Sequence, residues 1–150
     1  MTPTVLRATV GDVERLAPLF DLYRQFYRQP SDLALASCFL AQRLVRGESV
    51  VLLACDGEAV PGFTQLYPSF SSVHAQRTWI LNDLFVAPGA RRRGIARLLL
   101  QSAAEFARED GALRLELETD RDNAAAQSLY RRVGWVEYDD SLRFHLPLQV

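Results

Sequence analysis

The three consecutive arginines at residues 91–93 mark the segment that most constrains the fold of this chain. An apolar run at residues 79–86 comes before them, and a helical pattern of apolar residues begins at Ile95. This order predicts a strand, a turn and then a helix. The first N–H groups of a helix have no partner within it, and the helix dipole is positive there. Arginines beside such an N-terminus predict an anion site, for which phosphate is the natural ligand.

The length and the net charge of the chain limit its domain number and its classes of partner. The chain has 150 residues, so we expect one domain, residues 1–150, around a single core. The net charge is −1, which provides no general attraction to nucleic acid or to an anionic membrane. The sequence has no apolar run of membrane-spanning length, and its first residues lack the pattern of a signal peptide. We therefore expect a cytoplasmic protein.

The residue types exclude several kinds of chemistry. All 17 basic residues are arginine, so neither a lysine Schiff base nor a Walker-type phosphate lysine can form. The two histidines show no metal-ligand spacing, and we expect no metal. Cys38 and Cys55 form no CxxC motif, and we expect both to be buried thiols in a reducing compartment.

Hydrophobic periodicity predicts the element order α-α-β-β-β-α-β-α-β-β, a mixed α/β sheet covered by helices. We expect Asp12 to cap the first helix, Pro18 to kink or shorten it, and Asp122 to cap the last helix. A polar loop is predicted at residues 68–76. The chain is expected to end in a hairpin of residues 135–138 and 142–148.

The arginine turn alone leaves several interpretations open. It lacks the lysine of a Walker motif, and the spacing of Gly89 and Gly94 differs from the dinucleotide fingerprint. A solvated basic turn would have the same sequence. A nucleic-acid site would also need more basic surface and exposed aromatic partners.

Three segments together resemble one family. Arg91-x-x-Gly94-x-Ala96 matches the Arg/Gln-x-x-Gly-x-Gly/Ala signature of the GNAT superfamily of acyl-CoA-dependent N-acetyltransferases. Residues 81–86 resemble the strand that carries the acyl group in that family, and residues 123–135 resemble its N-x(6)-Y segment. The branch that is most similar holds small diamine, polyamine and histone-type acetyltransferases. The resemblance implies a mostly antiparallel sheet of about six to seven strands with a splayed parallel pair, flanked by four helices.

The resemblance also implies the residues that hold acetyl-CoA, which serves as a co-substrate. Pantetheine would add to the exposed strand edge as a pseudo-strand, and the pyrophosphate would lie on the N–H groups of the arginine turn. The residues expected to bind the co-substrate are Leu84, Phe85, Val86, Arg91, Arg92, Arg93, Gly94, Ile95, Ala96, Arg97, Asn123 and Tyr130.

Two residues are candidates for proton transfer. By resemblance, Tyr130 protonates the leaving thiolate, although a tyrosine on a helix face can also be a packing residue. Related diamine acetyltransferases often have glutamate where this chain has Asn82, and an amide cannot accept a proton. Asp83 could act as the base through a water, or it could be a buried carboxylate paired with Arg77 or with a backbone N–H.

The acceptor is expected near the first two helices, where Tyr23, Tyr27 and Asn82 are the candidate substrate-binding residues. The predicted reaction is direct attack of a small-molecule or peptide amine on the thioester. The resemblance also implies a homodimer, sometimes formed through the terminal strands. A non-catalytic module that binds or senses acyl-CoA is the alternative, because Asn82 stands where a base is common.

Overall fold

A computed structural model describes residues 2–149 of the chain. The chain divides into two units, Met1–Glu118 and Thr119–Val150. The first unit carries the whole sheet and three of the four α-helices of the described residues. The second unit carries the remaining helix and the C-terminal segment.

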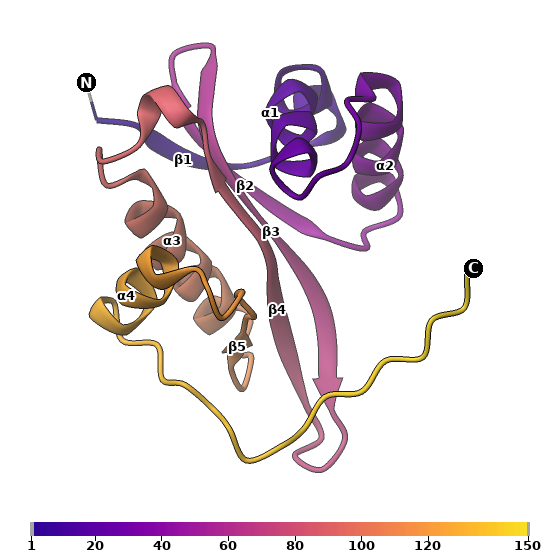
Figure 1. Cartoon of the computed structure of the whole chain (residues 1–150), viewed down its shortest axis with the longest axis vertical. Coiled ribbons are helices and arrows are strands. Elements are labelled where there is room, and N and C mark those ends of the chain that lie inside the picture. The colour runs from indigo at the N-terminus through magenta and orange to yellow at the C-terminus, as the bar shows by residue number, and fades with distance from the viewer. Residues whose placement is uncertain (1, 150) are drawn as a thin grey trace. The chain divides into compact units, whose positions relative to one another are not determined.

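The sheet has five strands in the order β1-β2-β3-β4-β5. Their bounds are β1 Thr4–Arg7, β2 Val50–Asp56, β3 Ala59–Ser71, β4 Gln76–Val86 and β5 Leu115–Glu116. The first four strands pair antiparallel, and β4 pairs parallel with β5. Figure 1 shows β3 and β4 as one long hairpin at the centre of the first unit. The expected mixed sheet with a parallel pair at its end is confirmed.

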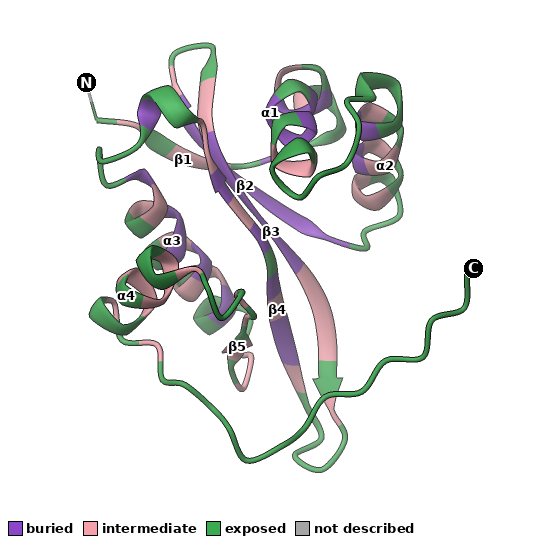
Figure 2. Cartoon of the chain, in the orientation of Figure 1, coloured by how far each residue is buried: buried purple, intermediate pink, exposed green. Residues whose placement is uncertain are grey.

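Helices cover both faces of this sheet. Helices α1 (Val13–Phe26) and α2 (Leu33–Val45) lie on one face, and α3 (Ile95–Glu109) lies on the other (Figure 1). The apolar stripe of each helix faces the strands, which is why buried residues concentrate along their inner sides (Figure 2). The core under α1 and α2 is built around fully buried side chains, among them Leu16, Leu40, Val51 and Phe63.

The strand prediction needs three corrections. Residues 68–71 and 76–78 belong to β3 and β4, so the predicted polar loop shrinks to residues 72–75. Thr4–Arg7 forms a strand that the sequence analysis missed, since four residues carry too little periodicity to detect. The predicted terminal hairpin is wrong, because residues 135–149 contain no strand. Within residues 2–149 the sheet therefore has five strands rather than six to seven.

The helix ends also differ from expectation. Helix α1 runs through Pro18 without interruption, since a proline in the second turn removes few intrahelical bonds. Asp12 occupies the N-cap position of α1, as expected, but its carboxylate accepts the Thr9 N–H at 2.8 Å and the Arg15 guanidinium and makes no hydrogen bond to a backbone N–H of α1. Asn123, rather than Asp122, caps α4 (Ala124–Arg132).

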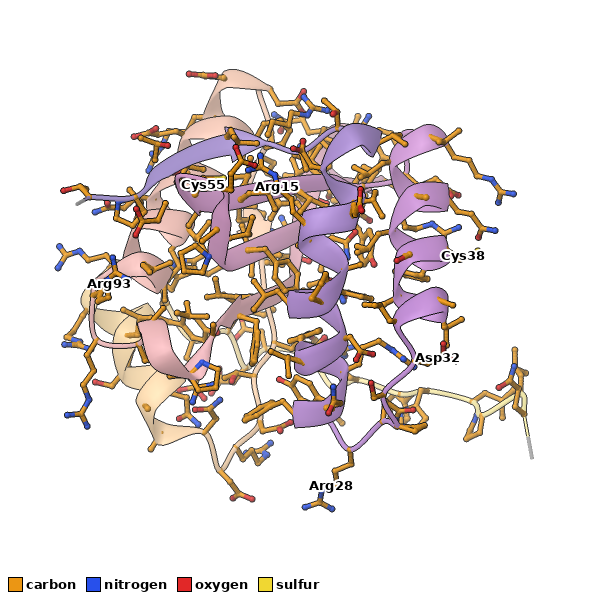
Figure 3. The ribbon with its side chains drawn as sticks, turned by 90° about the horizontal axis from the view of Figure 1, so that it is seen from above. Arg15, Arg28, Asp32, Cys38, Cys55 and Arg93 are labelled. Atoms are coloured by element: carbon orange, nitrogen blue, oxygen red, sulfur yellow. The ribbon has the colours of Figure 1, made fainter. Side chains whose placement is uncertain are left out.

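The two cysteines lie in different environments. Cys55 is buried at the end of β2 beside Arg15, as expected, and burial raises the pKa of its thiol (Figure 3). Cys38 is exposed on α2, so the expectation that both thiols are buried is wrong for this residue.

Candidate functional site

The free edge at the end of β4 is the main feature of the site. On the β5 side, β4 pairs only at Trp79 with Leu115 and at Ile80 with Glu116. Within the described part of the chain, residues 81–86 therefore have no strand on that side, while β3 pairs along the other side. An unpaired strand edge is a template for an extended ligand. The candidate residues Leu84, Phe85 and Val86 lie on this edge.

The turn after β4 has backbone geometry suited to an anion. Arg92 has φ of 65° and Gly94 has φ of 76°, so both lie in the left-handed region. Positive φ is uncommon for a residue with a side chain, and such conformations gather at ligand clamps. No side chain caps the N-terminus of α3, which begins at Ile95. Its first N–H groups are thus available to a ligand oxygen.

The arginines of the turn have different partners. The Arg91 Nε donates to the Val86 carbonyl at 3.3 Å, and its guanidinium lies 5.8 Å from the centre of the Phe85 ring. Arg91 therefore ties the turn to the end of β4. Arg93 reaches Asp56 at 3.5 Å and lies at the outer side of the first unit (Figure 3). Arg92 and Arg97 are exposed.

Gly62 positions α3 against the sheet, and the sequence analysis missed it. Gly62 pairs with Val86 at the end of β4. A Cβ at this position would lie 2.8 Å from Ile95 Cγ2 and 3.3 Å from the Phe85 carbonyl oxygen. Only glycine permits this approach, which sets the N-terminus of α3 beside the free edge of β4. A single glycine within an apolar strand gave no signal that could identify this role.

A β-bulge at Asn82 shapes the middle of β4. Asp83 pairs with Gln65 and Leu81 pairs with Leu66, so Asn82 is an extra residue between two consecutive partners on β3. Bulges are over-represented beside active sites, where they redirect side chains. Asn82 is exposed and its amide donates to Asp83 Oδ1 at 2.9 Å. The next residue, Asp83, is only 4% exposed.

Three neutral donors hold the Asp83 carboxylate. Besides Asn82, the Tyr23 hydroxyl donates to Oδ1 at 2.8 Å and the Gln65 amide donates to Oδ2 at 2.6 Å. Asp83 takes part in no ion pair within residues 2–149, and Arg77 lies instead over the rings of Phe70 and Trp79. The alternative that Asp83 pairs with Arg77 is therefore wrong. The carboxylate keeps its hydrogen bonds without a neutralising cation.

Aromatic rings surround this carboxylate on the α1 side. The Tyr23 ring contacts those of Tyr27, Phe63 and Phe85 at centroid distances of 5.2, 5.7 and 5.7 Å. Two candidate substrate-binding residues, Tyr23 and Tyr27, thus lie together, and Tyr23 adjoins Phe85 on β4. Burial, and then the nearby Asp83 carboxylate, raises the pKa of Tyr23. The same two causes raise the pKa of Tyr67 to about 12.

The remaining two candidates lie in the second unit. The Asn123 side chain accepts the Ala126 N–H at 3.1 Å, which is the capping role that was one of its two predicted functions. Tyr130 lies on α4, with its ring 6.3 Å from that of Trp135. The catalytic role of Tyr130 and the co-substrate contact of Asn123 stay predictions.

No group of three or more histidine, cysteine, aspartate or glutamate residues between residues 2 and 149 could hold a metal ion. No helix in the same range is long and apolar enough to cross a membrane.

Comparison with known proteins places this geometry in context. Residues 16–135 match the model of the acetyltransferase (GNAT) family. The uncharacterized N-acetyltransferase YhfO of Bacillus subtilis is 48% identical over 133 residues, which cover 89% of each chain. An aminoglycoside N(6')-acetyltransferase type 1 of Klebsiella aerogenes is 30% identical over 113 residues, covering 73% of this chain and 74% of that enzyme. The crystal structure of a probable acetyltransferase superposes with a TM-score of 0.93 and 42% identity, covering 98% of this chain and 99% of the other.

Proposed function

Because the chain belongs to the GNAT family of acetyltransferases, we propose that it transfers the acetyl group of acetyl-CoA to a primary amine. The amine attacks the thioester directly in a ternary complex. The observation that carries this proposal is the free edge of β4 at residues 81–86, which leads into the uncapped N-terminus of α3. The first unit thus has an unpaired strand edge that is followed directly along the chain by an anion site.

The co-substrate would bind along these two features. The pantetheine arm would add to the edge at Leu84, Phe85 and Val86 through backbone hydrogen bonds. The pyrophosphate would lie on the N–H groups of residues 92–97, where Arg92 and Arg97 are exposed and add positive charge. Gly94 and Ala96 keep side chains at the turn small.

We assign the steps of the reaction to the Val86 N–H, Asp83 and Tyr130. The Val86 N–H is the proposed donor to the carbonyl oxygen, which becomes negatively charged as the amine attacks. Asp83 is the proposed final acceptor of the proton that the ammonium must lose before its nitrogen attacks, and Tyr130 is the proposed proton donor to the departing thiolate. Acetyl-CoA supplies the activated acetyl group. The motifs contain no nucleophile that would carry a covalent intermediate.

The acceptor class rests on the aromatic group around Asp83. Tyr23, Tyr27 and Asn82 present rings and an amide beside a carboxylate, a combination that suits a small amine. Relatives named for aminoglycoside and streptothricin acetylation support small amines over proteins. They also speak against a module that binds acyl-CoA without transferring it. The diamine and polyamine branch remains a candidate within this class.

The proposed assembly is a cytoplasmic homodimer. The C-terminal segment exposes large apolar side chains in the single chain, with Leu142 83%, Phe144 90%, Leu146 80% and Leu148 87% exposed. Exposed apolar surface on this scale is typical of an interaction site. We propose that these side chains pack against a second copy of the chain.

Thermal unfolding with acetyl-CoA tests the binding half of this proposal. At about 100 times Kd, a ligand stabilises the folded state by about 2.7 kcal/mol, which raises Tm by roughly 5–10 °C for a chain of this size. The double variant Arg92→Gln/Arg97→Gln should lose most of that shift. Arg46→Gln, which removes an exposed arginine from the end of α2, should keep it. The absence of any shift in the unmodified protein would contradict the proposal.

A further inference from the structure

Asp83 is too buried to meet a substrate amine directly. It is 4% exposed, and the Gln65 amide that binds Oδ2 is fully buried. Three donors occupy the carboxylate, two on Oδ1 and one on Oδ2. A neighbour that is itself more accessible can carry a proton to Asp83.

Tyr23 is the neighbour with the right chemistry. The Asn82 amide nitrogen donates to Asp83 but accepts no proton, so it cannot pass one on. A phenolic hydroxyl donates and accepts at once. The Tyr23 side chain is half-buried, and its hydroxyl donates to Asp83 Oδ1 at 2.8 Å. This hydroxyl can receive one proton while it gives up another.

The position of Tyr23 also fits the proposed reaction. Its ring lies 5.7 Å from the ring of Phe85, which belongs to the free edge of β4. Asp83 and Phe85 are two residues apart on β4, so their side chains share one face of the strand. The Tyr23 hydroxyl is thus held beside the stretch where the thioester would bind.

We propose that Tyr23 relays the proton of the acceptor amine to Asp83; this inference rests on the proposed acetyl transfer. The ammonium group gives one proton to the Tyr23 oxygen while Tyr23 gives its own proton to Asp83 Oδ1. The amine becomes neutral, Tyr23 stays neutral, and Asp83 becomes a carboxylic acid. The nitrogen lone pair then forms the C–N bond as the C–S bond breaks. The nitrogen loses its second proton to solvent, and the departing thiolate takes a proton from Tyr130, which regains one from solvent. After turnover, Asp83 returns its proton to solvent by the reverse path.

The surroundings of the pair favour a relay over ionisation of Tyr23 itself. Burial and the Asp83 charge raise the pKa of the phenol, so it does not act as a phenolate near neutral pH. The other titratable groups that face the pair are Tyr27 on α1 and Tyr67 on β3, with Arg43 of α2 near Tyr67. The hydrogen bonds to the Asp83 carboxylate come from Tyr23, Gln65 and Asn82.

The test is the pH dependence of kcat/KM in Tyr23→Phe, measured with the best amine of an acceptor panel. This variant keeps the ring and leaves Asp83 two of its three donors. At pH 7 we expect a loss of about 100-fold or more, the usual contribution of a positioned acid or base. Because only free amine can then react, kcat/KM should rise about tenfold per pH unit up to the pKa of the amine. The unmodified enzyme should be much less dependent on pH over that range.

Controls separate the relay from a structural role. Tyr67→Phe removes a hydroxyl from another half-buried tyrosine near Asp83 and should keep both the rate and the pH profile. Asp83→Asn should match Tyr23→Phe, and the double variant should be no slower than either, since the two residues act as one unit. Circular dichroism checks that each variant is folded.

The outcomes distinguish the relay from the proposed function. If the unmodified enzyme acetylates amines and Tyr23→Phe keeps its rate and pH profile, the relay is overturned and the transfer stands. Independent, multiplicative losses in the double variant would also overturn the relay. If the unmodified protein releases no thiol with any amine, the proposed function fails, and the relay fails with it.

Discussion

Asp83 shows how a single residue can shape the chemistry of this chain. Removing a carboxylate from water costs several kcal/mol unless partners compensate it. Three neutral donors compensate Asp83 here, without a cation. No cation among the described residues pairs with this carboxylate, which is why we propose Asp83 as the base.

Tyr130→Phe tests the proposed acid. Removing the hydroxyl should lower turnover by about 100-fold to 10,000-fold, because thiolate departure loses its proton donor. The affinity for acetyl-CoA should stay unchanged, as measured by thermal shift. Tyr138→Phe, which alters a tyrosine that is 76% exposed, is the matched control. Equal turnover in Tyr130→Phe and in the unmodified enzyme would exclude this assignment.

Asp21 makes the free energy of unfolding depend on pH in the acidic range. Its carboxylate accepts the Ser31 hydroxyl at 2.6 Å and the Asp32 N–H at 2.8 Å, and these bonds lower its pKa in the folded state. The stabilisation is therefore complete above the unfolded pKa, near pH 4, and is lost as pH falls through the folded pKa. Urea unfolding should find Asp21→Asn less stable at pH 7, with the difference narrowing below about pH 4. A difference that is constant with pH would rule out this linkage.

Site residues could be predicted from the sequence where they belong to a motif with a fixed spacing. Arg91, Gly94 and Val86 belong to a known spacing, and the structure brings them to one end of β4. The Tyr23–Asp83 bond joins residues 60 positions apart, and no local pattern encodes such a pair. Such a contact depends on how α1 packs over the sheet, so it could only be found from the fold.

At the scale of elements, the site depends on two strands that separate. Residues 113–117 alternate like a strand, yet their pairing with β4 reaches only as far as Ile80, which pairs with Glu116. Helix and strand periodicity predicted most elements of the first unit, because each has one buried face. The extent of pairing between β4 and β5 could not be predicted, since it depends on register and twist.

Gly62→Ala tests how α3 is held at this site. The added Cβ would meet Ile95 at 2.8 Å, so the N-terminus of α3 must move away from the end of β4. We expect a lower Tm and an acetyl-CoA Kd that is raised about tenfold, because several backbone donors shift together. Gly11→Ala is the control, since its Cβ would find only an ordinary contact at 3.5 Å. Unchanged affinity would show that the close approach is not needed for binding.

For the molecule as a whole, the C-terminal segment is unusual because its large apolar side chains are not buried within the single chain. The alternation of Leu142, Phe144 and Leu146 predicted an apolar strand face, but the described residues form no strand there. In the described structure these side chains are exposed, so the pattern lacks the surface that it would cover. Alternating apolar residues predict which side chains share a face, but they do not predict which strand or surface that face will pack against. This is why the terminal hairpin was predicted wrongly.

Phe144→Asp tests whether this segment joins two copies. Light scattering after gel filtration should give the mass of two 16.9 kDa chains for the unmodified protein. A charge within the apolar segment should shift the mass toward one chain. Val73→Asp, at a residue 94% exposed in the β3–β4 turn, should leave the dimer intact. A monomer at all concentrations, or a dimer that Phe144→Asp does not weaken, would contradict the proposed assembly.

We propose that the free edge of β4 and the arginine turn hold acetyl-CoA for transfer to an amine. The most direct measurement is thiol release from acetyl-CoA across a panel of aminoglycosides, polyamines and amino acids, with mass spectrometry of the products. We expect thiol release that depends on the amine, and a product that is heavier than that amine by one acetyl group. Acetyl-CoA binding with no amine-dependent release across the panel would contradict this proposal.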